Sequence, residues 1–436
     1  MQLLQRLRKR SYWVVDFCKG SEIAKHLKDI ESIIHHTDYA TANHRKDVYL
    51  DSILKFATAT VPFYQKLNGK NIPLETFPVI NKNIIRDSQN DFRSSFYKDK
   101  TVSKVTTSGS TGTPFSVYQD TDKKKRGAAD MIFYARQAGF ELGNTLYYLR
   151  HWTRYYKKSK LLAWLQNVIQ VEVIDFSDEN IENLLIALAS DQSEKGFLGY
   201  ASSYQAICNY MERTEKKPKD YNITSIIAMS EGLSDSTKKG MEYYFKTPVV
   251  SRYSNMENGI IAQQLPKKGN DFQINWASYH IEVLELDSDI PVPFGTPGRI
   301  VVTDLFNKAM PLIRYDTGDV GVMQQYNPDE FPVLERIDGR KMDVILNTKG
   351  DIVSSFLILN AGKYKNIIQM QLVQESAKHY TFKLNTVDTF EEEETMRKEY
   401  QKYLGTDARI DFEYVDDIPL LASGKRKTIV NNYLKN

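Results

Sequence analysis

The chain has 436 residues, of which 41% are apolar and 26% are charged; this is the composition of a folded protein and excludes a disordered one. Its length allows two to three domains. With 58 basic and 55 acidic residues the net charge is only +3, which gives no reason to expect a nucleic-acid partner. Cys18 and Cys208 form neither a disulfide framework nor a metal-ligand spacing, which favours a reducing, cytoplasmic compartment.

The N-terminal segment is basic and amphipathic, with Leu3, Leu4 and Leu7 at helical spacing. Asp16 and Lys19 interrupt the apolar run that follows, so no secretory signal is predicted, and no stretch is long enough to cross a membrane. We interpret residues 1–70 as a helical lead-in whose first helix docks on the body of the protein. Peripheral contact of this segment with a membrane is the alternative.

Residues 106–115 read Thr-Thr-Ser-Gly-Ser-Thr-Gly-Thr-Pro-Phe. Glycines let backbone amides turn toward an anion, and the hydroxyl groups add further donors, so such a loop suits a polyphosphate. No Lys-Ser or Lys-Thr pair follows either glycine, which excludes a Walker A loop. An ordinary solvated turn is the alternative interpretation.

A basic run, Lys123-Lys124-Lys125-Arg126, follows the loop at the start of a predicted helix that ends near Ala138-Gly139. We expect it to be a solvated helix face; contact with a nucleotide phosphate or with CoA is the alternative.

Between residues 171 and 253 apolar runs alternate with helical spacing. The predicted elements are strand 171–175, helix 180–189, strand 196–199, helix 202–213 with Ser202 or Ser203 as its cap, strand 225–229, helix 234–245 and strand 249–253. This alternation predicts a parallel sheet covered on both faces. Ligands of such sheets bind beyond the carboxyl ends of the strands. Ser230-Glu231-Gly232 and residues 253–257 are therefore expected at a ligand-binding edge.

After residue 270 the pattern changes to strands and turns, with strands at 281–286 and 299–304, and a boundary falls near Asp338-Gly339-Arg340. Beyond it we predict two strands in 368–385, a helix at 391–404 and a strand at 408–415. The predicted fold class is α/β: a large N-terminal domain with parallel, helix-covered sheets and a β-rich subdomain (71–338), then a small α+β C-terminal lobe (339–436) that moves on a short hinge.

Four further segments accompany the loop. They are Arg-Tyr-Ser-Asn-Met-Glu at 252–257, Arg-Tyr-Asp-Thr-Gly-Asp at 314–319, Asp-Gly-Arg at 338–340 and Ser-Gly-Lys at 423–425. In this order the five segments resemble the adenylate-forming superfamily of acyl-CoA synthetases, luciferases and peptide-synthetase adenylation domains. The likeness is to the phenylacetate–CoA ligase branch and its relatives encoded among capsular-polysaccharide genes, and it extends over residues 75–436.

The resemblance implies a ligase that uses ATP and Mg²⁺ to convert a carboxylic acid into an acyl-adenylate with release of pyrophosphate. The acyl group then passes to CoA, to a carrier-protein thiol or to the amine of a sugar. A carboxylate is already nucleophilic at pH 7, so the reaction needs positioning and charge neutralisation rather than a general base. The structural zinc of some relatives is not expected, because a cysteine cluster is missing from the sequence.

The same resemblance implies a role for each motif. The β- and γ-phosphates would be wrapped by Thr107, Ser108, Gly109, Ser110, Thr111 and Gly112. The adenine would be framed by Ser230, Glu231, Gly232 and Tyr253. Glu257 would hold Mg²⁺, Asp319 would accept hydrogen bonds from both ribose hydroxyls, and Arg340 would close the ribose side. Lys425 would stabilise the charge that develops on the α-phosphate, so Lys425 and Glu257 are the predicted catalytic residues.

The sequence also departs from the family pattern. Ser254 and Met256 stand where the family has Gly and Thr, so the phosphate contact of that Thr would move to Asn255. Met342 occupies a hinge position that is acidic or Lys in many relatives. These departures keep open a catalytically inactive nucleotide- or ligand-binding protein of the same fold. A third interpretation is a membrane-attached scaffold for polysaccharide assembly, which depends on the N-terminal segment alone.

The acid-binding pocket is predicted at a cluster of tyrosine and arginine side chains in 147–156, together with the segment 199–202. Its candidate residues are Tyr148, His151, Trp152 and Tyr200. Such a cluster favours a polar or aromatic acid over a long fatty chain; core residues with tethered hydroxyls are the alternative.

Overall fold

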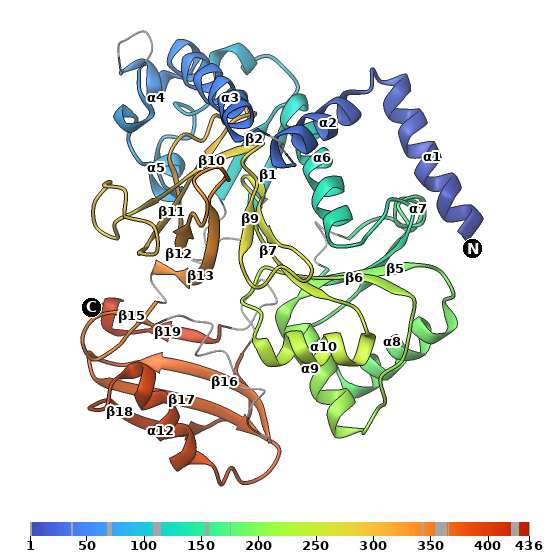
Figure 1. Cartoon of the computed structure of the whole chain (residues 1–436), viewed down its shortest axis with the longest axis vertical. Helices are drawn as coiled ribbons and strands as arrows, with labels where there is room; N and C mark the ends of the chain where they lie inside the picture. Colours follow the sequence, from blue (N-terminus) through green and yellow to red (C-terminus); the bar gives the residue numbers. More distant parts are fainter. Residues whose placement is uncertain are drawn as a thin grey trace. The chain divides into compact units, whose positions relative to one another are not determined.

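The structure, a computed structural model, describes residues 2–35, 38–67, 72–107, 115–152, 157–174, 176–341, 344–353, 364, 366–419 and 427–435 (Figure 1). The chain divides into two compact units. The first comprises Met1–Lys9, Ala138–Arg252 and Ile337–Asn436, and the second comprises Arg10–Gln137 and Tyr253–Arg336. Among the helices that the structure describes, none is long and apolar enough to cross a bilayer.

A parallel sheet with the strand order β4-β3-β5-β6-β7 forms the centre of the first unit. In chain order its elements are β3 (Thr145–Leu149), α7 (Lys160–Leu165), β4 (Val168–Val171), α8 (Asp178–Ser190), β5 (Lys195–Tyr200), α9 (Ala201–Arg213), β6 (Ile223–Met229), α10 (Asp235–Phe245) and β7 (Val249–Asn255). Helices α8, α9 and α10 lie along one face (Figure 1), where Leu184, Ile207 and Met241 pack against Phe197 and Ile226 of the strands. The last residues of β7, from Tyr253, belong to the second unit.

The predicted parallel arrangement is confirmed, with two local differences. The strand expected at 171–175 ends at Val171 and begins at Val168. Helix α9 begins at Ala201 after Tyr200, whose side chain makes no capping hydrogen bond. The predicted serine cap is wrong, because Ser202 lies inside the helix and its backbone N donates to Oε2 of Glu231 at 2.9 Å. The carboxylate of Glu231, two residues after β6, thus accepts a hydrogen bond from a free backbone N–H group in the first turn of α9.

The C-terminal lobe has a sheet in the order β18-β17-β16-β19, in which β16 and β17 are antiparallel and the outer pairs are parallel. Its elements are β14 (Ile345–Leu346), β15 (Ile352–Val353), β16 (Ile367–Gln374), β17 (His379–Thr386), α12 (Glu393–Leu404), β18 (Arg409–Tyr414), β19 (Ile429–Asn431) and the short helix Tyr433–Lys435. Helix α12 buries Met396, Tyr400 and Leu404 against Phe382 and Leu384 of β17. The strands and helix predicted for this lobe are confirmed to within two residues.

The second unit is built from N-terminal helices, a hairpin and antiparallel strands. Its helices are the end of α1 (Gln2–Cys18), α2 (Glu22–Ile34), α3 (Tyr39–Thr60), α4 (Pro62–Gln65), Leu74–Thr76, α5 (Lys82–Asp87), Ser95–Tyr97 and α6 (Thr121–Gln137). Its strands are β1 (Ser103–Thr107), β2 (Phe115–Gln119), β8 (Gly259–Gln264), β9 (Phe272–Ile274), β10 (Tyr279–Leu284), β11 (Pro297–Asp304), β12 (Tyr315–Gln324) and the start of β13 (Val333–Arg340). Strands β8 to β13 lie in the order β10-β11-β12-β13-β9-β8.

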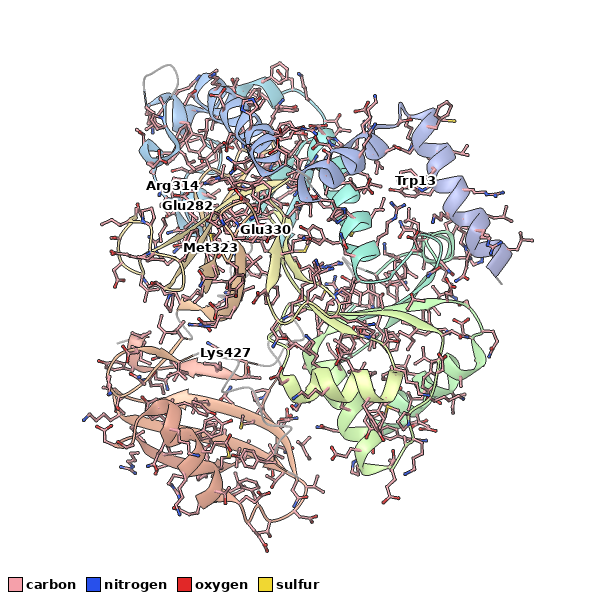
Figure 2. All side chains as sticks on the ribbon, in the orientation of Figure 1. Trp13, Glu282, Arg314, Met323, Glu330 and Lys427 are labelled. Carbon is pink, nitrogen blue, oxygen red and sulfur yellow. The ribbon has the colours of Figure 1, made fainter. Side chains whose placement is uncertain are left out.

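Buried arginine–carboxylate pairs fix the antiparallel sheet of the second unit. Arg314 has a left-handed backbone (φ 50°) and is 3% exposed; its guanidinium group contacts both carboxylate oxygens of Glu282, with Nη2 2.9 Å from Oε1 (Figure 2). Arg299 binds Asp316 at 2.6 Å and Asp289 at 2.8 Å. The bidentate pair of Arg314 with Glu282 sets geometry as well as adding energy, and Arg299 joins Asp316 to Asp289, so these contacts hold the segment that begins β12 in one conformation.

The basic run at 123–126 is not a solvated face, and that prediction is wrong for two of its members. Lys123 is buried and binds Asp304 at 2.7 Å. Arg126 is fully buried, with Nη1 2.6 Å from Oδ2 of Asp29 and Nε 2.8 Å from the hydroxyl of Ser278. The α-helical period turns positions 123 and 126 inward while the two intervening lysines face outward.

Replacing Arg126 with leucine is expected to lower the free energy of unfolding by about 3 kcal/mol, because Asp29 and Ser278 lose a buried partner. Urea denaturation of the full chain measures this change. Lys124→Leu is the matched control, since Lys124 is exposed and its ammonium contacts the hydroxyl of Ser103 at 3.0 Å; its effect should stay within about 0.5 kcal/mol. Equal effects of the two variants would contradict the proposed role of Arg126.

Candidate functional site

The predicted phosphate loop connects the strands of an antiparallel hairpin. Strands β1 and β2 pair in register from Ser103 opposite Gln119 to Thr107 opposite Phe115. The hydroxyls of Thr106 and Ser116 are 3.0 Å apart across the hairpin, next to its tip. Thr107 closes the ladder through its backbone, and the loop residues Ser108, Gly109, Ser110, Thr111 and Gly112 lie outside the described part of the chain. The pairing of Thr107 with Phe115 therefore holds the two ends of this loop next to each other.

Glu257, the predicted Mg²⁺ ligand, is a buried carboxylate at the turn that follows β7. Its side chain is 2% exposed. The hydroxyl of Tyr315 donates to Oε1 at 2.8 Å, and the ammonium of Lys82 lies 2.9 Å from the same atom. Gln119, at the end of β2, donates to the backbone carbonyl of Glu257 at 3.1 Å. Glu257 is thus tied both to β12 and to the hairpin.

The donor set around Glu257 is compatible with a magnesium ion that is held mainly by phosphate and water. Both contacts of the carboxylate reach Oε1, and Oε2 takes part in neither. In the described residues no cluster of three or more His, Cys, Asp or Glu side chains could hold a metal by itself. Mg²⁺ in nucleotide sites commonly takes one or two carboxylates and completes its octahedron with phosphate oxygens and water. A buried carboxylate whose Oε2 takes part in neither of these contacts meets that requirement.

A second buried pair places the predicted ribose acceptor. The hydroxyl of Tyr253 donates to Oδ2 of Asp319 at 2.8 Å and to the hydroxyl of Thr317 at 3.2 Å. Burial raises the pKa of Tyr253 well above its usual value, and the charge of Asp319 raises it further, so the phenol stays protonated and can donate. Asp319 itself is only partly buried.

Together these contacts form a reciprocal arrangement of two tyrosines and two carboxylates. Tyr253 and Glu257 are four residues apart in one segment, and Tyr315 and Asp319 are four residues apart in the other. Each segment's tyrosine donates to the carboxylate of the other segment. Burial, followed by the charge of Glu257, also raises the pKa of Tyr315 well above its usual value. Two protonated phenols therefore fix two predicted site carboxylates relative to each other.

The rest of the 314–319 motif gives Asp319 its position. The hydroxyl of Thr317 donates to the carbonyl of Ile300 at 2.9 Å and accepts from the backbone N of Asp319. Gly318 has φ +78°, a conformation that L side chains rarely adopt. The carboxylate of Asp316 accepts from the backbone N of Gly318 at 2.8 Å. Asp316, Thr317 and Gly318 thus set the backbone conformation that positions Asp319.

In the first unit the other predicted nucleotide residues follow β6. Ser230 has a left-handed backbone (φ 71°) and is exposed, as is Gly232. Glu231 turns back to the N-terminus of α9, as described above. The carboxyl ends of the neighbouring strands meet at this edge, because Tyr200 is paired with Met229 in the ladder between β5 and β6. Ser230 and Gly232 are accordingly placed as an edge site requires.

The candidate acyl-pocket residues gather at the same edge. The hydroxyl of Tyr148 lies 3.9 Å from the sulfur of Met229 and 3.4 Å from Nη1 of Arg150. The rings of Tyr148 and Trp152 are 5.1 Å apart and nearly perpendicular. Burial raises the pKa of Tyr200, although the nearby Arg150 lowers it. The structure thus brings Tyr148, Trp152 and Tyr200 to one strand edge.

The tyrosine–arginine cluster has a supporting carboxylate that the sequence did not suggest. His151 Nδ1 lies 3.2 Å from Oε1 of Glu172, and the backbone N of Trp152 donates to Oε2 of Glu172. His151 is therefore turned toward Glu172, and it belongs to the support of the cluster. Residues 153–156, which the prediction included, lie outside the described residues.

Two predicted residues come from the C-terminal lobe. Arg340 is exposed at the end of β13. Lys425, together with Met342 of the proposed hinge, lies outside the described residues. Asn255 is the last residue of β7 and accepts through its side chain from the backbone N of Asn258 at 2.8 Å, so it shapes the turn that carries Glu257.

Sequence reasoning missed Lys82 and gave no role to Tyr315, although both contact Glu257. A signal for Lys82 existed. It is the first residue of α5, directly after the cap Asn81, where the helix dipole disfavours a positive charge. A lysine at such a position indicates a carboxylate elsewhere in the chain.

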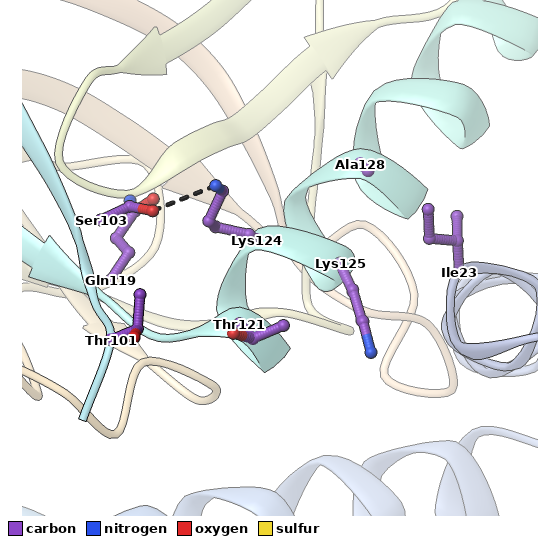
Figure 3. A pocket seen from close by; sticks show the side chains of 8 residues that line it. All are labelled: Ile23, Thr101, Ser103, Gln119, Thr121, Lys124, Lys125 and Ala128. Carbon is purple, nitrogen blue, oxygen red and sulfur yellow. Dashed lines mark hydrogen bonds between the residues drawn. The ribbon is translucent and has the colours of Figure 1, made fainter. Parts of the chain in front are cut away.

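An open hollow of about 300 Å³ lies beside the start of α6 (Figure 3). It is lined by Ile23, Thr101, Ser103, Gln119, Thr121, Lys124, Lys125 and Ala128. The described side chains that line it include two lysines and no acid. Ser103 and Gln119 are at the end of the hairpin opposite Thr107, so the hollow is separated from the loop by the length of the strands. Gln119, which lines the hollow, also donates to the backbone carbonyl of Glu257.

Comparisons with solved structures define the class of this fold. A 2-hydroxyisobutyryl-CoA ligase in the postadenylation state, in complex with R3-HIB-AMP, matches 91% of this chain with 90% of its own at a TM-score of 0.72 and 16% identity. ATP-bound MatB from Rhodopseudomonas palustris matches 74% of this chain with 66% of its own at a TM-score of 0.55 and 15% identity. The anthranilate CoA ligase AuaEII gives a TM-score of 0.55 at 14% identity, over 74% of this chain and 65% of its own. The fold is that of the adenylate-forming CoA ligases.

Sequence comparison adds a more specific relationship. Residues 345–432 match the family of the CapK C-terminal domain. Protein CapK of Staphylococcus aureus is 23% identical over 383 residues, which cover 84% of this chain and 82% of that protein. The chain is thus a CapK homologue with the fold of the adenylate-forming ligases, and both resemblances predicted from the sequence motifs are confirmed.

Proposed function

We propose that this protein is an ATP-dependent ligase that activates a carboxylic acid as an acyl-adenylate and releases pyrophosphate. The observation that carries the proposal is the reciprocal pairing of Tyr253 with Asp319 and of Tyr315 with Glu257. This pairing fixes Glu257, a carboxylate suited to a magnesium ion, and Asp319, a carboxylate suited to the two hydroxyls of a ribose. A nucleoside triphosphate with its bound magnesium carries both groups. The hairpin that carries the Ser/Thr/Gly loop is bonded to Glu257 through Gln119.

In this proposal the residues of the chain position and neutralise charge. Magnesium, when bound, would draw electron density from the phosphate oxygens and offset their charge. Glu257 would hold that ion, Asp319 would orient the ribose, and Lys425 would approach the α-phosphate. The acid's carboxylate attacks the α-phosphorus and the bond to the bridging oxygen of the pyrophosphate breaks, so no proton transfer is needed. The proposed reaction therefore needs no general base.

The substrate class that we propose is a polar or aromatic acid of modest size. Its pocket would lie at the edge where Tyr148, Trp152, Tyr200 and Arg150 gather. The acceptor would be CoA, a carrier-protein thiol or an amino sugar. Structural neighbours that were solved with acyl-AMP and CoA support the first of these, and the similarity to CapK is the reason to keep the others.

Product analysis tests the proposal directly. The protein would be incubated with ATP, Mg²⁺ and a panel of aromatic, hydroxy, amino and short aliphatic acids, and the nucleotides separated by chromatography. The proposal expects AMP and pyrophosphate, with acyl-AMP accumulating until an acceptor is added. Parallel reactions with CoA, with a carrier-protein thiol and with glucosamine distinguish the acceptors. Formation of ADP and phosphate would contradict acyl-adenylate chemistry.

Asp319→Asn is expected to raise the KM for ATP about tenfold to a hundredfold, because an amide oxygen is a weaker acceptor for the ribose hydroxyls than a carboxylate. Steady-state kinetics with varied ATP measures this. Tyr253→Phe is the matched control: it removes the phenol that holds Asp319 but leaves the carboxylate, so its effect should be smaller. An unchanged KM in Asp319→Asn would exclude a ribose contact.

A catalytically inactive nucleotide-binding protein is the second candidate, and one observation favours it. The ammonium of Lys82, 2.9 Å from Glu257, neutralises the carboxylate that the metal would need. Such a protein would bind ATP and form no AMP with any acid or acceptor.

A further inference from the structure

Helix α1 presents its apolar side chains to solvent and its polar side chains to the protein. Leu3 is 71% exposed and Phe17 is 75% exposed, and Leu4, Leu7, Val14 and Val15 are also exposed. At 100° per residue, Leu3, Leu7, Val14 and Phe17 fall within an arc of about 80°. A helix on the surface of a globular domain normally buries this stripe. In α1 the usual orientation is inverted.

The opposite face of α1 explains how the inverted helix is held. The Gln5 side chain donates to the carbonyl of Glu194 at 2.7 Å, and Lys9 binds Glu141 at 2.7 Å. Asp16 is buried, and its carboxylate accepts from the backbone N of Ile23 and of Ala24 at the start of α2. These are directional polar contacts, so the helix is docked in one rotation and the exposed stripe is a fixed feature of the surface.

A second exposed apolar segment adjoins the N-terminal half of α1. Arg8 donates to the carbonyl of Trp164 at 3.2 Å, and its guanidinium group is 5.5 Å from the Trp164 ring. Trp164 is 60% exposed. Three further apolar side chains of α7 are also exposed, namely Leu161, Leu162 and Leu165. The leucines of α1 and this short helix are two exposed apolar segments joined through Arg8, and we call them together the α1–α7 surface. Surfaces of this kind mark interaction sites.

The charges on the α1–α7 surface are of one sign. Arg6 and Arg10 of α1 are exposed, and Arg10 falls within the arc of the apolar stripe. Lys157 and Lys160 are exposed at the start of α7. The only acid in the sequence of α1 is Asp16, which is buried, and residues 157–171 contain none. Arginine stems can lie along an apolar phase while the guanidinium groups remain at its polar boundary.

We infer that the α1–α7 surface docks on an anionic lipid bilayer. An exposed helix with a leucine and phenylalanine stripe, flanking arginines and an adjacent exposed tryptophan has the chemistry of a helix that lies in the interface of a membrane. The apolar side chains enter the boundary between headgroups and acyl chains, and the basic side chains pair with lipid phosphates. The protein docks by one side of its surface and does not span the bilayer.

Vesicle flotation of the full chain tests this inference, with phosphatidylcholine vesicles compared with vesicles that also contain phosphatidylglycerol. We expect the protein to float with the anionic vesicles, less with the neutral ones, and less at high salt. Leu3→Ser with Leu7→Ser should lower the partition coefficient by at least about tenfold. Arg6→Gln with Arg10→Gln should lower the partition coefficient about twenty-fivefold, because each arginine contributes about fivefold.

Ile186→Ser is the matched control, because Ile186 is an exposed apolar residue on α8, outside the α1–α7 surface. It should float as the unmodified protein does, and all variants should keep the thermal midpoint, since each changed side chain is exposed. Failure of the unmodified protein to float, or equal flotation of Leu3→Ser with Leu7→Ser, would overturn the inference. So would a dimer, seen by sedimentation without vesicles, that the leucine substitutions abolish, because a second copy would then cover the surface.

Discussion

Lys425→Ala is expected to slow acyl-adenylate formation about a hundredfold to a thousandfold while ATP binding changes little. An ammonium group at the α-phosphate would act where charge develops in the transition state, and loss of such a group costs about 3–4 kcal/mol of activation free energy. Rapid-quench measurement of acyl-AMP, with saturating ATP and acid, isolates this step. Lys425 stands after Ser-Gly in the segment 423–425, where the resemblance places a catalytic lysine.

The neighbours of Lys425 provide its control. Arg426 and Lys427 follow directly, so Arg426→Ala and Lys427→Ala change the same net charge at nearly the same place. Both should retain the rate within about tenfold, since a charge that does not contact the phosphates is screened by solvent and salt. A loss that is as large in either of them, with Lys425→Ala nearly active, would mean that the catalytic lysine has been assigned to the wrong position.

Glu257→Gln is expected to lower the rate of acid activation at least about a hundredfold, with partial recovery at high Mg²⁺. The amide has the shape of the carboxylate but lacks its charge, so the ion is held less tightly and charge on the phosphates is less well offset. The rate is measured against Mg²⁺ concentration. Because Lys82 is one-third exposed, loss of this ion pair should change the free energy of unfolding by no more than about 1 kcal/mol.

Lys82→Gln separates a metal role of Glu257 from a merely structural ion pair. It removes the same salt bridge but leaves the carboxylate, which still accepts from Tyr315. The catalytic assignment expects Lys82→Gln to stay within about tenfold of the unmodified rate and to show no greater demand for Mg²⁺. If both variants lost activity equally and neither responded to Mg²⁺, the ion pair itself would be the important feature.

Local patterns in the sequence predicted most of the fold. Strand–helix alternation between residues 171 and 253 was enough for the parallel sheet, because continuous apolar strands such as β6 (Ile223–Met229) have no other stable environment. The C-terminal lobe was equally predictable, because apolar residues recur at strand spacing in β16 and β17 and at helical spacing in α12. The capping of α9 was not predictable from local sequence. The carboxylate that caps the helix belongs to Glu231, which lies 29 positions after Ser202, whose backbone N it binds.

The candidate site was predictable only in part, for a related reason. Motif order pointed to Glu257 and Asp319, but their tyrosine partners lie in segments 58 and 66 positions away. The inward turn of Lys123 and Arg126 depends on Asp304 and Asp29, which local sequence does not reveal. Helix α1 shows the same limit: its amphipathic period predicts a helix, but tertiary hydrogen bonds through Gln5 and Lys9 decide which face is buried.

Acid-dependent exchange of labelled pyrophosphate into ATP tests the central claim most directly, because it reports the adenylation step without any acceptor. The unmodified chain would be assayed with Mg²⁺ across aromatic, hydroxy, amino and short aliphatic acids. We expect exchange with one class of acid, which would identify the substrate class, and none when the acid is omitted. Measurable ATP binding with no exchange for any acid would contradict the proposed ligase activity and favour the inactive nucleotide-binding protein.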